Sequence, residues 1–331
     1  KNVVSQDTED YTDNLKKIKP DFLVHGDDWI NDNRKVIRQR AIKTLKKWGG
    51  RLIEPKYSRN IIAEKNDKKN NQNKIENRVN KLSRLIQAKD IVRVLESHNS
   101  LTGLIIENLS LVKKNKFFEF DCMWSSSLTD SAVKGKPDNQ AVDYSSRILS
   151  LNDTMDVTSK PVIFDADNGG RIEHLGYLIR SLERSGVSAI AIEDKIGLKK
   201  NSLFKNQKGT KQDNPLQFAK KIKKIVELRN SKDFMIIARI ESFILNKGLE
   251  DAIKRAEIYS KAGADAILIH SKNKTPKEIF SFAKKFNLSK YRVPLVAVPS
   301  TYSSVKEKDL IKYGFKIVIY ANQLLRAAFP A

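Results

Sequence analysis

Three acidic residues follow two neighbouring apolar runs and could bind a metal ion. Asp165 and Asp167 come directly after the run 161–164, and Glu193 comes directly after the run 189–192. In an extended strand, residues two apart point to the same face. Two carboxylates there repel unless a cation lies between them, and Mg²⁺ takes few carboxylate ligands and keeps several waters. The sequence therefore predicts a magnesium site at these residues, with surface or capping acids as the alternative.

A second group of candidates carries cations and amides. Its members end later apolar runs or lie in the loop 195–202: Lys199, Asn201, Ser202, Arg239 and His270. Arg and Lys beside a magnesium site favour an anionic substrate, such as a phosphate or a carboxylate. A histidine at a strand end can equally be a buried structural residue, so both roles stay open for His270.

A third candidate is the serine-rich segment that begins with Trp124 and includes Ser126. Serine hydroxyls can orient an oxyanion, although a simple serine-rich turn would look the same. The segment is followed by a loop that contains Gly, Lys and Pro and leads to Asp138. We interpret Asp138 as a residue of a mobile loop over the site.

These side chains need a scaffold that brings successive strand ends together. Eight candidate strands are found, with helical segments such as 172–185, 215–228, 249–261 and 276–286 between them: 92–97, 118–125, 161–167, 189–194, 235–241, 266–271, 295–299 and 316–321. Continuous apolar runs are typical of strands buried on both faces. Eight strand–helix units predict a (β/α)8 TIM-type barrel of the α/β class, with its active site at the carboxyl ends of the strands. An open doubly wound sheet is the alternative.

The composition narrows the classes of function. The 331 residues carry a formal net charge of +23 and one cysteine, Cys122. The cysteine count excludes an internal disulfide framework and, with no secretory signal visible, favours the cytoplasm. No apolar run approaches the length needed to span a membrane. The basic residues are spread out without interleaved aromatics, so a basic surface that attracts anionic substrates is favoured over nucleic-acid binding.

Taken together, the motifs carry a resemblance to a known family. In chain order they are Trp124–Leu128, Lys134–Asp138, Asp165–Asp167, Glu193–Lys195, Lys199–Leu203, Ala238–Glu241 and Ile269–Ser271. Residues 79–331 resemble the phosphoenolpyruvate mutase family of the isocitrate lyase superfamily. The resemblance implies the interconversion of phosphoenolpyruvate and phosphonopyruvate, which makes a carbon–phosphorus bond.

The resemblance also implies roles for the candidate residues. Asp165, Asp167 and Glu193 would hold Mg²⁺ directly or through water, and the metal would steady the enolate oxygen. The phosphoryl group would be held by Ser126, Asn201, Arg239 and His270. Trp124 and Ser202 would contact the substrate, Lys199 would belong to a gating loop, and Asp138 would lie near the phosphoryl group.

Some residues depart from the family's motifs, and a second function of the same superfamily remains as an alternative. Asn168 stands where the family often has Thr. The lyase branch needs a catalytic cysteine in its loop, whereas Cys122 lies inside a predicted strand, so lyase chemistry is not expected. A hydrolase of phosphonopyruvate or oxaloacetate shares the metal site and remains the alternative, with Asn201 favouring the mutase. We expect a homo-oligomer, a tetramer or dimer of dimers, and expect that the family's C-terminal helices lie beyond Ala331.

The first 62 residues resemble a different family from the rest of the chain. Residues 1–62, with the motif His25–Trp29, resemble the C-terminal half of a cytidylyltransferase-like nucleotidyltransferase. The family's His-x-Gly-His motif is absent, so this segment is expected to be inactive alone. Residues 63–78 offer almost nothing to bury and are predicted to be a solvated linker.

Overall fold

The computed structural model describes residues 4–6, 8–30, 34–55, 78–113, 116–197, 199–204 and 207–329. The chain divides into two compact units, one formed by Lys1–Gln72 with Val112–Lys116, and the other by Asn73–Leu111 with Phe117–Ala331. The predicted linker 63–78 lies outside the described residues except for Arg78. No helix within the described ranges is long and apolar enough to cross a membrane.

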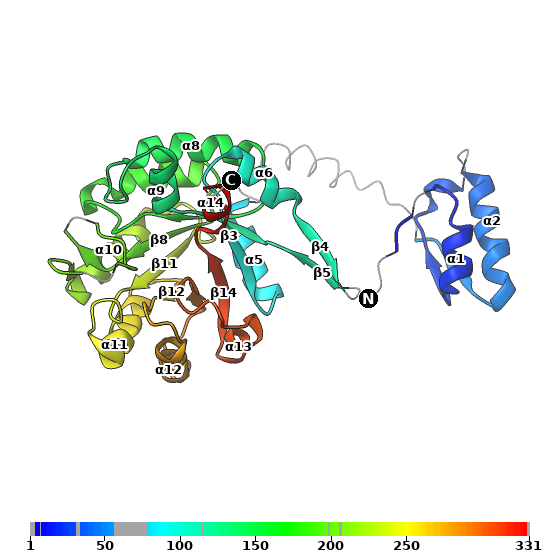
Figure 1. Ribbon diagram of the computed structural model, residues 1–331. Coiled ribbons are helices and arrows are strands. Elements are labelled where there is room, and N and C mark those ends of the chain that lie inside the picture. The colour runs from blue at the N-terminus through cyan, green and yellow to red at the C-terminus, as the bar shows by residue number, and fades with distance from the viewer. Residues whose placement is uncertain are drawn as a thin grey trace. The chain divides into compact units, whose positions relative to one another are not determined.

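The larger unit is a closed barrel of eight parallel strands (Figure 1). Around the barrel the strands follow chain order: β3 (Val92–Glu96), β6 (Cys122–Ser125), β7 (Val162–Asp165), β8 (Ala189–Glu193), β11 (Met235–Ile240), β12 (Ala266–Ile269), β13 (Leu295–Ala297) and β14 (Phe315–Tyr320). β14 pairs with β3 and closes the circle. The predicted (β/α)8 barrel is therefore confirmed, and the open sheet is excluded.

Helices precede, separate and follow the strands, and most of them lie on the outside of the barrel. They are α5 (Lys81–Ala88), α6 (Ser100–Asn108), α7 (Ser127–Val133), α8 (Tyr144–Asp156), η3 (Ile172–His174), α9 (Leu175–Arg184), α10 (Pro215–Leu228), α11 (Gly248–Lys261), α12 (Lys277–Phe286), α13 (Glu307–Lys312) and α14 (Gln323–Ala328). The helix predicted at 215–228 has these bounds because Asn214 Oδ1 caps Leu216 N at 2.9 Å and Pro215 occupies the first turn. Two short strands, β9 (Lys195–Ile196) and β10 (Lys211–Gln212), pair with each other in antiparallel orientation within the β8–α10 loop.

One predicted strand was wrong in its extent. The segment 118–125 is divided between β5 (Lys116–Glu119), which pairs with β4 (Ser110–Lys113), and the barrel strand β6. The division falls at Asp121, whose Oδ2 accepts a hydrogen bond from Arg93 N at 2.9 Å and whose Oδ1 binds Lys89. These side-chain contacts fix the chain where it enters the barrel, so a continuous apolar pattern did not mean a continuous strand.

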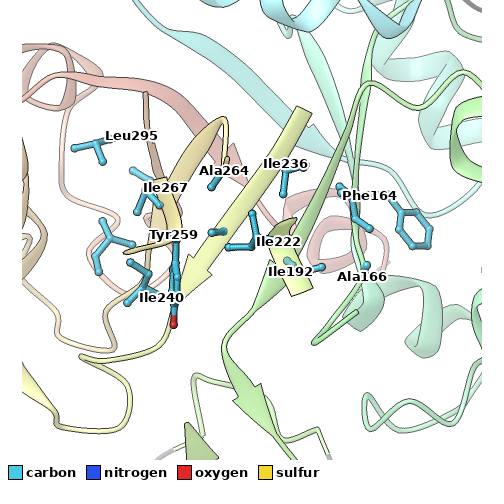
Figure 2. Close-up of a cluster of buried hydrophobic side chains, with 14 of the residues drawn as sticks. Phe164, Ala166, Ile192, Ile222, Ile236, Ile240, Tyr259, Ala264, Ile267 and Leu295 are labelled. Carbon is cyan, nitrogen blue, oxygen red and sulfur yellow. The ribbon is translucent and has the colours of Figure 1, made fainter. Parts of the chain in front are cut away.

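The core has two layers because strand residues alternate between the two faces of the barrel. In β11, Met235 and Ile237 belong to the cluster inside the barrel. Ile236 and Ile240 belong to the cluster between the strands and the outer helices, which Figure 2 shows in part. This alternation decides which strand-end residues face the barrel mouth.

The smaller unit contains α1 (Thr12–Ile18), β1 (Phe22–Val24), η1 (Asp27–Trp29), α2 (Lys35–Leu45), η2 (Lys46–Trp48) and β2 (Arg51–Ile53). β1 and β2 pair in parallel, as a strand–helix–strand unit does. Its core holds Leu15, Trp29, Ala41 and Leu45. Glu54 accepts hydrogen bonds from Trp29 Nε1 at 2.7 Å and from Arg38 Nε at 2.6 Å. The resemblance to a nucleotidyltransferase stays a prediction.

Candidate active site

Four of the eleven predicted site residues stand at the ends of the rows of side chains that fill the barrel. Inside the barrel, Ile163 is followed by Asp165, Ala191 by Glu193, and Ile237 by Arg239 at the same period of two. The same alternation leads from Leu268 to His270. Side chains at these positions point inward. Polar groups therefore gather at the carboxyl-terminal mouth, as expected for this fold.

The acids are buried: Asp165 is 7%, Asp167 4% and Glu193 3% exposed. Asp167 lies beyond the end of β7 and has φ of 50°. The strand alternation expected for the two aspartates thus does not apply to Asp167, and a left-handed turn brings it to the site instead. Ser127 Oγ donates to Asp165 Oδ2 at 2.9 Å.

Lys199 joins this acid cluster from the β8–α10 loop. Its ammonium lies 2.7 Å from Asp138 Oδ1, and it also contacts Asp167 Oδ1 and Ser127 Oγ. Burial opposes the charge on Lys199, but the carboxylates of Asp167 and neighbouring acids outweigh burial and raise its pKa. The same cation helps to lower the pKa of Asp165, against the effect of burial.

Arg239 and His270 form a neighbouring cationic and polar group. Arg239 Nε donates to Glu241 Oε1 at 2.6 Å, and its Nη2 lies 2.9 Å from Ser202 Oγ and 3.1 Å from His270 Nδ1. Burial, together with the charge of Arg239, lowers the pKa of His270. His270 is therefore a neutral imidazole near neutral pH, beside a permanently charged guanidinium.

Glu193 is a buried acid whose pKa is strongly affected by its surroundings. Its nearest cations, Lys195 Nζ and Arg239 Nη2, are each 3.5 Å away. Burial and the nearby charge of Glu241 raise its pKa to about 7, against the opposing effects of these cations. A carboxyl group of this kind exchanges a proton near neutral pH and gains most from an added cation.

A cavity of about 70 Å³ joins these groups. Nine of the predicted residues line it: Trp124, Ser126, Asp138, Asp165, Lys199, Asn201, Ser202, Arg239 and His270. Asp167 and Glu193 are not in its lining. Asp167 contacts Lys199, and Glu193 lies 3.5 Å from Arg239. The structure thus brings the predicted site residues into one place.

Asn201 has a structural contact as well as a position in the lining. Its Oδ1 accepts a hydrogen bond from Leu203 N at 2.9 Å, which is the turn-capping contact that asparagine often makes. The amide nitrogen is the part of the side chain left to donate toward the cavity. Gln207 Nε2 donates to Asn201 O at 2.9 Å, and this second hydrogen bond stabilises the turn.

Sequence reasoning missed several residues that hold the site together. Glu241 is fully buried and binds Arg239, and Ser127 bridges Asp165 and Lys199. Arg147, 2% exposed, donates to Asp130 Oδ2 at 2.8 Å and to the backbone oxygen of Asp165 at 2.5 Å. The period of two from Arg239 could have indicated Glu241. Ser127 lies within the serine-rich segment noted in the sequence, but its contact with Lys199 was not expected, and nothing in the sequence indicated Arg147, because the partners of both residues are distant in the chain.

The donor set fits a divalent cation in its chemistry. Asp167 Oδ1 is buried, and among the described residues its contact is the Lys199 ammonium. A buried carboxylate oxygen that is in contact with a cation suits positive charge, and Mg²⁺ prefers oxygen ligands of this type. Within the described ranges, no three His, Cys, Asp or Glu side chains form a ready coordination group. Water-mediated ligation, which is common for Mg²⁺, needs no such group.

Known proteins share this barrel and much of its sequence. The chain is 37% identical over 252 residues to phosphoenolpyruvate phosphomutase of Tetrahymena pyriformis, covering 76% of this chain and 79% of the relative. It is 36% identical over 242 residues to phosphonopyruvate hydrolase of Variovorax sp. (strain Pal2), covering 72% and 81%. The crystal structure of a phosphonopyruvate hydrolase complex with oxalate and Mg²⁺ matches with a TM-score of 0.67 at 31% identity, covering 78% of this chain and 83% of that chain.

These relatives place the chain among the enzymes of the phosphoenolpyruvate mutase/isocitrate lyase superfamily. The family model described as phosphoenolpyruvate phosphomutase matches residues 82–331, which is most of the chain and the whole barrel. The match includes every residue that lines the cavity. The chain therefore belongs to the phosphoenolpyruvate phosphomutase family.

Proposed function

We propose that this protein interconverts phosphoenolpyruvate and phosphonopyruvate. The observation that carries the proposal is the single cavity in which Asp165, Arg239 and His270 meet beneath the Lys199–Ser202 segment. In the reaction, the bond from phosphorus to the enol oxygen breaks and a bond from phosphorus to the methylene carbon forms. No other reactant is consumed, so the protein must position one molecule and stabilise its charge.

Arg239 and His270 are proposed to hold the phosphoryl group. Arg239 already has its guanidinium oriented by Glu241 and Ser202, so little entropy is lost when an oxyanion binds. The neutral imidazole of His270 adds a polar contact without requiring a second charge. Ser126 and the amide of Asn201 line the same cavity and are proposed to donate to the remaining oxygens.

Asp165, Asp167 and Glu193 are proposed to hold Mg²⁺, directly or through water. When bound, the metal would supply positive charge next to the enolate oxygen of the pyruvate part. Ser127 orients Asp165 through its 2.9 Å hydrogen bond. Arg147 fixes the backbone at Asp165, where β7 ends. We propose that the contacts of Lys199 close the β8–α10 loop over the substrate and exclude water.

Hydrolysis of phosphonopyruvate is the second candidate function. It is favoured by the 36% identity to a phosphonopyruvate hydrolase, nearly equal to the identity with the phosphomutase. ³¹P NMR of the purified protein with phosphonopyruvate and Mg²⁺ separates the two. A phosphoenolpyruvate signal supports the mutase, whereas stoichiometric inorganic phosphate without phosphoenolpyruvate would replace it by the hydrolase.

The front unit is a separate proposal. We propose that residues 1–62 have the fold of the C-terminal half of a cytidylyltransferase-like domain, supported by the parallel β1–β2 pair and its connecting helix α2. We expect no nucleotidyl transfer from this chain. Incubation with CTP and a phosphonate should release no pyrophosphate, and its release would contradict this expectation.

A further inference from the structure

A second cavity, of about 560 Å³, lies beside the β8–α10 loop in the barrel unit. Its lining contains five cationic side chains and no acidic one: Lys208, Lys211, Lys247, Arg255 and Lys272. They come from the β10 end of the loop, from the N-cap and the middle of α11 and from the segment after β12. A concave surface with charges of one sign concentrates ions of the opposite sign.

The charge of this cavity is only partly neutralised. Arg255 is paired with Asp194 at 3.1 Å and with Asp251 at 2.9 Å. Lys272 donates to the backbone oxygen of Ile244 at 2.9 Å and has no acidic partner among the described residues. Lys211 and Lys247 are exposed, and the described part of the chain gives their ammonium groups no ion pair. Three lysine charges are therefore available to a ligand.

The start of α11 adds to this positive potential. The helix has 14 residues, its N-cap is Lys247, and no side chain caps its first turn. The acids of that turn are already engaged, because Glu250 binds Lys285 and Asp251 binds Arg255. The positive end of a helix favours anions, so the helix and the lysines act in the same direction.

We infer that this cavity binds a small phosphate-type anion, such as inorganic phosphate or a phosphate monoester, at a site separate from the one proposed for catalysis. Lysine ammonium groups bind phosphate as point charges, and three of them suit a doubly charged anion. The volume leaves room for a small organic group on the phosphate.

The cavity shares a wall with the loop that bears Lys199 and Asn201. Gln207 and Lys211 line it, and Gln207 Nε2 donates to Asn201 O and Phe204 O, both at 2.9 Å. An anion bound to Lys211 would restrain the segment 207–212, which Gln207 joins to Asn201. The effect of this restraint on turnover rests on the proposed function, whereas binding of the anion does not.

Phosphate binding to the full chain tests the site by calorimetric titration at low ionic strength. The substitutions Lys211→Gln and Lys247→Gln together should remove one bound phosphate relative to wild type, whether or not the catalytic cavity also binds one. Lys220→Gln with Lys308→Gln changes the net charge equally on exposed residues of α10 and α13 and should bind as many phosphates as wild type. No phosphate bound by wild type, or as many bound by the Lys211/Lys247 variant as by wild type, would overturn the proposal.

Hydrogen exchange of residues 207–212 tests the link to the loop. Phosphate should slow exchange there in wild type and in the Lys220/Lys308 control, and much less in the Lys211/Lys247 variant. Equal slowing in all three would refute the link. Neither measurement requires turnover, so the loss of the proposed mutase activity would not be confused with the loss of this site.

Discussion

The ammonium of Lys199 lies 2.7 Å from Asp138 Oδ1 and joins the β8–α10 loop to the loop after α7. The two side chains are 7% and 9% exposed. A buried cation and a buried carboxylate stabilise each other only if they remain together, because either one alone is costly to desolvate. The pair therefore couples two loops that are 61 residues apart in the chain.

Removing this pair should have non-additive effects on catalysis. Lys199→Met and Asp138→Asn should each lower kcat/KM, and the double variant should be less impaired than the sum of the two losses. Residues in direct contact typically show a coupling of about 0.5–3 kcal/mol. Steady-state kinetics of the four proteins measures it. Strictly additive losses would mean that the contact does not contribute to loop closure.

Arg239→Ala should damage catalysis more than Lys199→Ala. Arg239 is fixed in β11 by Glu241 and Ser202, whereas Lys199 is on a loop. Loss of a contact that stabilises transition-state charge costs about 10²–10³ in rate. As a control, Arg229→Ala breaks the ion pair with Asp265, at 2.6 Å, without touching the cavity, and should reduce stability but not kcat. An Arg239 variant with near wild-type kcat/KM would refute the proposed contact with the phosphoryl group.

Glu193 should make stability and metal binding depend on pH. Burial raises its pKa to about 7, above the value of about 4.3 in an unfolded chain. The folded protein therefore binds more protons in this range, so stability is full below about pH 4 and is lost as pH rises through about 7. Without divalent cations, Tm should fall over this window in wild type and much less in Glu193→Gln.

The same titration predicts proton release on metal binding. Because a ligating carboxylate must be deprotonated, Mg²⁺ added below about pH 7 should displace a proton and bind more tightly as pH rises. Calorimetry in two buffers with different ionisation enthalpies measures the release. Equal release by wild type and Glu193→Gln would remove Glu193 from the metal site.

The sequence was sufficient for residues whose position follows from strand alternation. Asp165, Glu193 and Arg239 continue inward rows that regular strands define, so their convergence could be predicted. Contacts between loops could not be predicted, because a sequence does not show which loop residues meet. Ser127 bridging Asp165 and Lys199 is of this kind. The strand predicted at 118–125 failed for a related reason: side-chain bonds to Asp121, formed only in the fold, interrupt it.

We expect Asn201 to favour the mutase over the hydrolase, and its contacts allow its two proposed roles to be separated. Asn201→Ala removes both the turn acceptor for Leu203 N and the amide donor toward the cavity. It should slow mutase turnover and shift the remaining products toward inorganic phosphate, because water enters a loop that is less well closed. Asn201→Asp keeps an acceptor for the turn but loses the donor, so it should lose turnover with a smaller change in Tm.

Asn214 provides the matched control for this comparison. Its Oδ1 accepts from Leu216 N at 2.9 Å, the same contact and distance that Asn201 makes with Leu203 N, but at the start of α10 and outside the cavity lining. Asn214→Ala should cost about 1 kcal/mol of stability, as a lost cap does, without changing the products. ³¹P NMR and thermal melts of the three variants give both readouts. If Asn201→Ala behaves like Asn214→Ala, Asn201 only supports its turn, and the hydrolase becomes the better proposal.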